Sequence, residues 1–137
     1  MRNAVVTGTS TGIGFATSLR LARAGYCVFA GMRNLAKAQP LRDAAAEAGL
    51  PVEVIELDVC STPSVDAAFA AVRGHGPVAV LVNNAGIGGA APLELTPEAE
   101  HRQMFETNYF GAIRCIQAVL PEMLLMVLLV RTVHHLV

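Results

Sequence analysis

The stretch Ala4-Val5-Val6-Thr7-Gly8-Thr9-Ser10-Thr11-Gly12-Ile13-Gly14 decides the fold of this chain. It opens with a short apolar run typical of a buried strand, and its glycines follow the spacing Gly-x-x-x-Gly-x-Gly. Such glycines permit a tight turn, a close backbone approach to a ligand, and tight packing of the next helix on the strand. A pyrophosphate would then lie on the first helical turn, where free N–H groups and the helix dipole favour an anion. The stretch therefore predicts a dinucleotide-binding turn.

Composition and charge narrow the class of protein. The chain has 137 residues, which is the size of one domain with its own core. Hydrophobic residues make up 53% and charged residues 15%, which fits a sheet that is buried on both faces. The net charge of -1 provides no basic field for nucleic acid and no cationic patch for a lipid surface. We therefore expect neither nucleic acid nor a membrane surface as a partner.

The cysteines and the apolar segments point to a reducing, cytoplasmic compartment. Cys27, Cys60 and Cys115 are far apart and form no Cys-x-x-Cys pair, which argues against disulfides and a zinc site. The adjacent His134 and His135 have no evident third ligand, so no metal is expected. No targeting signal is evident, and the longest apolar run, residues 123–130, is far shorter than the roughly 20 residues of a membrane span.

Short apolar runs alternate with longer helical patterns along the chain. Strands are expected at residues 3–6, 26–30, 52–57 and 78–82, and helices at 12–24, 35–48, 63–73 and 97 to about 120. This order predicts one α/β domain over residues 1–137, a Rossmann-like doubly wound parallel sheet. The apolar tail, residues 123–137, fits either a fifth strand or further helical turns, because periodicity does not separate the two. Ligands of such sheets bind beyond the carboxyl ends of the strands, at the switch point in strand order.

The end of the second expected strand bears on the choice of cofactor. An NAD-binding domain places an acidic residue there, which accepts a hydrogen bond from the ribose 2′-hydroxyl, but no acidic residue lies between Gly14 and Asp43. Arg33 instead offers a fixed cation with a planar donor fork, which suits the 2′-phosphate of NADP. The alternative is that Arg33 is a solvated loop residue. The pattern predicts NADP (NADPH) in preference to NAD.

Two further strand ends carry polar groups, Leu57-Asp58-Val59 and Asn83-Asn84-Ala85-Gly86. Asparagine and glycine are common in ordinary turns, so the second motif alone is generic. Together with the glycine stretch, however, these motifs resemble the short-chain dehydrogenase/reductase family of Rossmann-fold NAD(P)-dependent oxidoreductases. The resemblance extends from Asn3 to about Met123.

The resemblance implies a set of cofactor-binding residues. The pyrophosphate would be lined by Gly8, Gly12, Ile13 and Gly14, with Ser10 and Thr11 also binding the cofactor. Asp58 and Val59 would contact adenine, while Asn84 and Gly86, with Ala85 between them, would meet the adenosine ribose. Asn83 would tie neighbouring strands together.

A later segment, Met104 to Gly111, resembles the family's helix that carries an active-site asparagine, and Asn108 is the matching residue. In the family this asparagine supports a water relay to the catalytic lysine. Met104, Asn108 and Gly111 share one helix face, so the amide of Asn108 is expected to point inward. The alternative is an asparagine whose amide is satisfied by neighbouring backbone.

The acid and base groups of the family are missing from this sequence. Reduction of a carbonyl needs a proton donor and a group that stabilises the oxyanion, for which the family uses a Tyr-x-x-x-Lys pair and a serine. The two tyrosines are followed four positions later by Ala30 and Ile113, and the sole lysine is Lys37. Thr132 is at best a weak match to the serine. We therefore expect cofactor binding without chemistry.

Three interpretations remain open from the sequence. The first is the amino-terminal, cofactor-binding part of an NADP-dependent oxidoreductase that acts on a small-molecule alcohol/carbonyl pair, ending before the catalytic residues. The second is a non-catalytic NAD(P)-binding or interaction protein whose apolar tail forms a homo-oligomer. The third is an altered reading frame or early stop, because the family pattern is lost abruptly after Met123.

Overall fold

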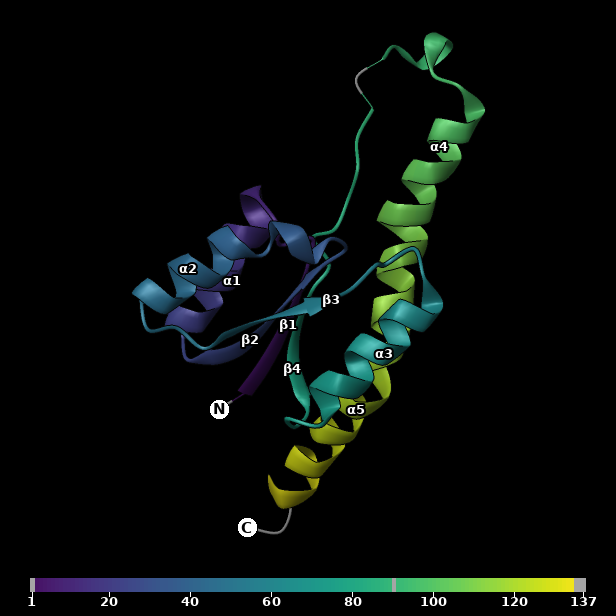
Figure 1. Cartoon of the computed structure of the whole chain (residues 1–137). Coiled ribbons are helices and arrows are strands. Elements are labelled where there is room, and N and C mark those ends of the chain that lie inside the picture. Colours follow the sequence, from purple (N-terminus) through teal and green to yellow (C-terminus); the bar gives the residue numbers. More distant parts are fainter. Residues whose placement is uncertain (1, 90, 135–137) are drawn as a thin grey trace.

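A parallel four-stranded sheet forms the centre of the computed structural model, which describes residues 2–89 and 91–134, with side chains of the last helix described to Leu125 (Figure 1). The strands are β1 (Arg2–Thr7), β2 (Tyr26–Met32), β3 (Val52–Glu56) and β4 (Val78–Val82). Their order is β3-β2-β1-β4, and each neighbouring pair is parallel. The order reverses at β1, so the switch point lies between β1 and β4. The predicted Rossmann-like α/β class is confirmed.

Helices cover both faces of this sheet (Figure 1). One face carries α1 (Gly12–Arg23) and α2 (Gln39–Glu47), and a short 3-10 turn, η1 (Leu35–Lys37), precedes α2. The other face carries α3 (Thr62–Arg73) and α5 (Gly111–His134). A second 3-10 turn, η2 (Leu93–Leu95), precedes α4 (Glu98–Phe105), and the π-helical segment η3 (Glu106–Phe110) joins α4 to α5. The expected helix from residue 97 to about 120 is thus a longer succession of α, π and α segments.

Alternating side chains of the strands build hydrophobic cores on the two faces of the sheet. Val5 and Phe29 point to the α3 and α5 side, where they pack with Phe69 and Val119. Their neighbours along the strands face α1 and α2: Ala4, Val6, Val28 and Ala30. Since β1 and β2 are covered on both sides, their central residues, Ala4–Val6 and Val28–Ala30, are all apolar. In β4 only Val78 is fully buried, because β4 is an edge strand within the described residues.

The apolar tail is helical where the structure describes it. Residues 124–134 continue α5, so the possible fifth strand does not form there; residues 135–137, with His135, lie outside the described part. Leucine and methionine are good helix formers, and α5 continues through Pro121, which removes one backbone donor. None of the described helices combines the length and the apolar character needed to cross a membrane.

Cys115 provides a test of the core beneath α5. Its side chain is fully buried, and this burial raises the pKa of the thiol from 9.0 to about 11, although nearby Arg114 acts in the opposite direction. Above pH 9 the unfolded chain releases the thiol proton and the folded chain keeps it, so stability falls as pH rises through 11. We expect a loss of roughly 2 kcal/mol at pH 10.5 relative to pH 8.

The measurement for Cys115 is urea unfolding of the wild type and Cys115→Ala at both pH values. Other groups titrate in both proteins, so the difference between the two pH dependences isolates the thiol. Equal losses in wild type and variant would contradict the assignment.

Candidate cofactor site

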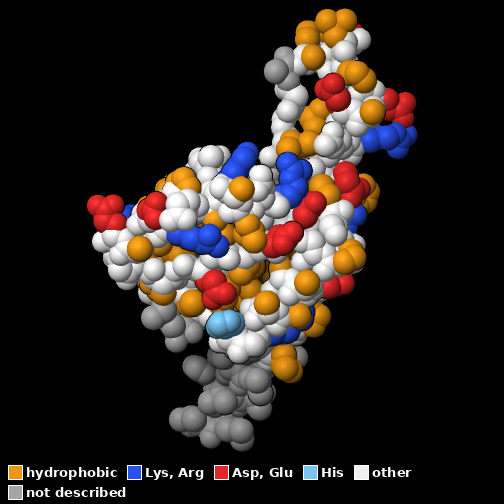
Figure 2. Space-filling model, in the orientation of Figure 1, with side chains coloured by type: hydrophobic (Ala, Val, Ile, Leu, Met, Phe, Trp, Pro, Cys, Tyr) orange, Lys and Arg blue, Asp and Glu red, His pale blue; other side chains and the backbone are white. Residues whose placement is uncertain are grey.

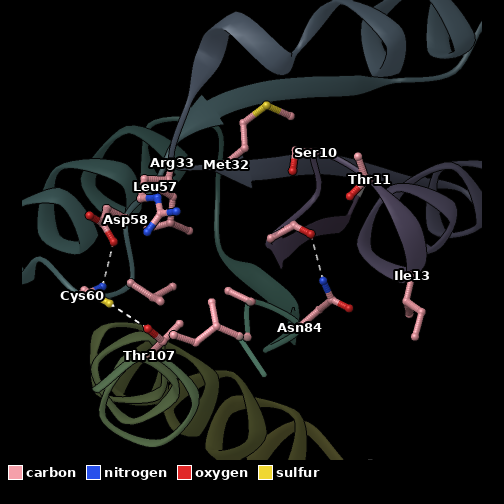
Figure 3. Close-up of a pocket in the computed structure, with 15 residues that line it drawn as sticks. Ser10, Thr11, Ile13, Met32, Arg33, Leu57, Asp58, Cys60, Asn84 and Thr107 are labelled. Atoms are coloured by element: carbon pink, nitrogen blue, oxygen red, sulfur yellow. Dashed lines mark hydrogen bonds between the residues drawn. The ribbon is translucent and has the colours of Figure 1, made fainter. Parts of the chain in front are cut away.

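A cleft of about 370 Å³ opens at the carboxyl ends of the strands (Figure 3). It is formed by residues at and just after the carboxyl ends of the four strands, together with Ile13 of α1 and Thr107 of η3. The predicted cofactor-binding residues that line it are Gly8, Ser10, Thr11, Ile13, Arg33, Asp58, Val59, Asn84, Ala85 and Gly86. Gly12 and Gly14 do not line the cleft but shape the loop beside it. The structure therefore brings the predicted set together, while the role of each residue stays a prediction.

The glycine loop depends on its missing side chains. Gly8 and Gly12 adopt left-handed backbone conformations, with φ of 69° and 61°. A Cβ on Gly14 would lie 2.3 Å from the carbonyl oxygen of Gly8 and 2.4 Å from Nδ2 of Asn84. Helix α1 can therefore begin against the loop only because residue 14 lacks a side chain.

The first turn of α1 is open to an anion. Thr11 occupies the N-cap position with an extended backbone, yet its hydroxyl forms no capping hydrogen bond within the described residues. The side chain of Ile13 is 79% exposed at the mouth of this turn. Helix N-terminal N–H groups that lack a side-chain acceptor favour an external anion such as a phosphate. The geometry thus fits a pyrophosphate at this position.

Two buried threonines hold the glycine loop between its neighbouring strands. The Thr7 hydroxyl oxygen accepts hydrogen bonds from the backbone N–H groups of Asn84, at 3.0 Å, and Ala85, at 2.9 Å. On the other side, both the N–H and the hydroxyl of Thr9 donate to the Gly31 carbonyl oxygen at 3.1 Å. The loop is therefore fixed to the ends of β4 and β2 before any ligand binds.

Asn84, and not Asn83, ties the strands together. The Asn84 amide nitrogen donates to the carbonyl oxygens of Thr7 and Gly8, each at 2.9 Å, while Asn83 is exposed. The expectation for Asn83 was wrong because successive side chains along an extended segment point to opposite sides, and residue 84 is the one that faces β1. Within the described residues the Asn84 amide oxygen has no hydrogen bond, so it remains an acceptor beside the cleft.

The loop after β3 is pinned by polar and steric contacts. The Asp58 carboxylate accepts from the Cys60 N–H at 3.0 Å, and the Asp58 N–H donates to the Ser64 hydroxyl oxygen at 3.0 Å. Arg114 donates to the Val59 carbonyl oxygen at 3.1 Å. A Cβ on Gly111 would lie 2.7 Å from Cγ2 of Val59, so the start of α5 lies directly against this loop.

Arg33 lies at the same end of the cleft as Asp58 (Figure 3). Its side chain is exposed and forms no ion pair within the part of the chain that the structure describes. Among the described residues, the guanidinium is therefore a cation without a carboxylate partner. The first turn of α1, which fits a phosphate, lies at the other side of the same cleft.

Asn108 clamps the loop after β4. Its amide oxygen accepts from the Ile87 N–H and its amide nitrogen donates to the Ile87 carbonyl oxygen, both at 2.8 Å. Asn108 is exposed and does not line the cleft, so the described structure matches the alternative in which backbone satisfies the amide. A Cβ on Gly86 would lie 3.3 Å from the same amide oxygen. The relay role stays a prediction.

Sequence reasoning missed some lining residues: Met32, Leu57, Cys60, Ile87 and Thr107. Each of them directly adjoins a predicted residue in the sequence. Extending each motif by one position would have found all of them, since a loop that meets a ligand usually does so with consecutive residues. Residues 2–89 and 91–125 contain no group of three or more His, Cys, Asp or Glu side chains that could hold a metal ion.

The fold and the glycine loop at the switch point define a Rossmann-like α/β protein. Residues 2–127 match the family model described as short chain dehydrogenase, and the chain belongs to this family of oxidoreductases. The predicted family resemblance is confirmed.

Three similar proteins illustrate the match. Bovine (Bos taurus) retinol dehydrogenase 8 is 45% identical over 126 residues, which cover 89% of this chain and 40% of that protein. Rat (Rattus norvegicus) estradiol 17-beta-dehydrogenase 1 is 41% identical, with 87% of this chain and 36% of that protein covered. The alcohol dehydrogenase of the archaeon Thermococcus sibiricus, solved with 5-hydroxy-NADP, is 36% identical with a TM-score of 0.82, and the match covers 89% of this chain and 53% of that one. The chain thus spans about 40% of the length of these curated relatives.

Proposed function

We propose that this chain binds NADPH in the cleft at the switch point, in preference to NADH. The observation that carries the proposal is the open first turn of α1, held against a glycine loop that leaves no room for a side chain at residue 14. This turn would hold the pyrophosphate. Asp58 and Val59 would face the adenine, and Asn84 to Gly86 would meet the adenosine ribose. When bound, the cofactor would supply a hydride to a carbonyl or accept one from an alcohol.

Arg33 supports the preference for the 2′-phosphate. It lines the cleft, it lies beside the proposed adenine end, and no acid is present at the end of β2 to accept from a free 2′-hydroxyl. A guanidinium binds phosphate through paired, charge-assisted hydrogen bonds. The Thermococcus sibiricus relative, solved with a derivative of NADP, is consistent with this choice.

We expect Arg33→Ala to weaken NADPH binding roughly tenfold and to leave NADH binding unchanged, because one exposed charge-assisted contact is worth about 1.5 kcal/mol. Fluorescence titration of both reduced cofactors measures the two affinities. Arg42→Ala is the matched control, since Arg42 is exposed on α2 and does not line the cleft. Equal affinity of the wild type for NADPH and NADH would show that Arg33 does not select the cofactor with the 2′-phosphate.

For the whole protein we propose NADP-linked oxidation and reduction of an alcohol/carbonyl pair. The two curated relatives are named for alcohols on large apolar skeletons, retinol and estradiol. These 137 residues contain no Tyr-x-x-x-Lys pair, so we propose cofactor binding alone for them.

A second candidate function is a non-catalytic, NAD(P)-binding protein that assembles with itself. It is favoured by exposed hydrophobic side chains along the joined helices α4, η3 and α5: Phe105, Tyr109, Ile116, Leu120 and Leu124. Figure 2 also shows hydrophobic side chains gathered over the projecting segment before α4, which holds Leu93 and Leu95. Sedimentation of the purified chain distinguishes the candidates: a stable dimer that tightens with NADPH supports the second, and a monomer overturns it.

A further inference from the structure

The segment η3 touches two of the loops that border the cleft. Thr107 is 8% exposed and its hydroxyl oxygen lies 3.3 Å from the Cys60 sulfur, in the loop after β3 (Figure 3). The next residue, Asn108, binds the backbone of Ile87 in the loop after β4. Consecutive residues of one helix thus reach two different strand ends, and the wider π turn over Glu106–Phe110 is where this occurs.

Cys60, which contacts Thr107, also forms a hydrogen bond with Asp58, one of the predicted cofactor-binding residues. The N–H of Cys60 donates to the Asp58 carboxylate at 3.0 Å, so the position of residue 60 sets the direction of that carboxylate. Cys60 and Thr107 both line the cleft at the end where Arg33 and Asp58 lie (Figure 3). A hydroxyl on η3 is therefore linked, through one thiol and one backbone N–H, to the group expected to face adenine.

We propose that Thr107 is a positioning residue for the adenine end of the cofactor and that it acts through Cys60 on Asp58. The inference rests on the proposed function and deepens it, because it assigns a role to Thr107, which was not among the predicted site residues. A preformed carboxylate direction lowers the cost of binding, since the loop does not have to be ordered when the nucleotide arrives.

Helix docking does not depend on this hydroxyl. Arg114 binds the Val59 carbonyl oxygen, and Gly111 lies directly against the Val59 side chain. Removing the Thr107 hydroxyl therefore leaves α5 attached to the loop. Its effect on nucleotide binding can then be separated from an effect on folding.

The test compares Thr107→Val, which removes the hydroxyl at nearly constant volume, with Thr107→Ser, which keeps it. Isothermal titration with NADPH and with adenosine 2′,5′-bisphosphate, a probe that contains only the adenine end, gives the affinities. We expect Thr107→Val to lower the affinity for both ligands by the same factor, about fivefold, and Thr107→Ser to keep the wild-type affinity. Thr96→Val is the matched control, because the Thr96 hydroxyl bonds only backbone outside the cleft.

The outcomes separate this inference from the proposed function. If the wild type binds neither ligand, both the proposed function and the role of Thr107 are refuted. If the wild type binds both and Thr107→Val binds them equally well, or loses affinity for NADPH alone, the proposed function stands and the role of Thr107 is refuted. Should Thr107→Val prove unstable, Cys60→Ala and Cys60→Ser replace it. We then expect Cys60→Ala, which lacks a polar atom to meet the Thr107 hydroxyl, to bind both ligands about fivefold more weakly than Cys60→Ser. Equal affinities of these two variants would refute the role of Thr107.

Discussion

Gly14→Ala is expected to abolish measurable NADPH binding and to destabilise the fold by roughly 3 kcal/mol. The new Cβ would lie 2.3 Å from the Gly8 carbonyl oxygen and 2.4 Å from the Asn84 amide nitrogen. The first contact is with backbone, so no change of side-chain rotamer relieves it. Helix α1 has to move away from the glycine loop, and the turn proposed to hold the pyrophosphate moves with it.

Urea unfolding and NADPH titration together measure the effect at Gly14. Gly88→Ala is the matched control, because a Cβ there meets no atom within 4 Å and Gly88 has no left-handed backbone. We expect this control to behave as the wild type. A Gly14→Ala variant with wild-type stability and wild-type affinity would show that α1 and the loop are not packed as described.

Thr7→Val is expected to cost about 3 kcal/mol of stability, although it changes the side-chain volume very little. Thr7 is buried and its hydroxyl oxygen accepts from two backbone N–H groups, those of Asn84 and Ala85. Valine would leave both half-buried donors without their partner, at roughly 1–3 kcal/mol for each. The ends of β1 and β4 would separate at the switch point, so NADPH affinity should fall as well.

Chemical denaturation of Thr7→Val and Thr7→Ser tests this account. Serine keeps the acceptor oxygen and loses only a methyl group, so we expect it to recover most of the lost stability. If serine and valine destabilise the protein equally, the methyl packing and not the hydrogen bonds explains the effect.

Patterns within the chain predict the sheet well for physical reasons. The strands β1 and β2 are covered by helices on both faces, so their apolar runs stand out clearly from the flanking polar residues. The glycine stretch predicts the loop before α1 because left-handed backbone at Gly8 and Gly12 is a local property of the chain. The cleft follows from topology, since parallel strands bring their carboxyl ends to one edge.

Properties that depend on distant parts of the chain were harder to predict. The choice between Asn83 and Asn84 depends on which residue faces Thr7, across 77 positions of sequence. The π-helical segment that turns Thr107 toward Cys60 cannot be recognised from the spacing of apolar residues in the sequence. The helical state of residues 124–134 was open because a short apolar run fits a strand and a helix equally well.

Protection of Cys60 from alkylation tests the central claim, that the cleft at the switch point binds NADPH. Cys60 lines the cleft, whereas Cys27 is similarly half-buried but lies outside it, so Cys27 serves as an internal control. Iodoacetamide labelling followed by peptide mass spectrometry gives both rates. We predict that NADPH slows labelling of Cys60 in a saturable manner and leaves Cys27 unchanged. Unchanged labelling of Cys60 at millimolar NADPH, or equal slowing of both cysteines, would contradict the account.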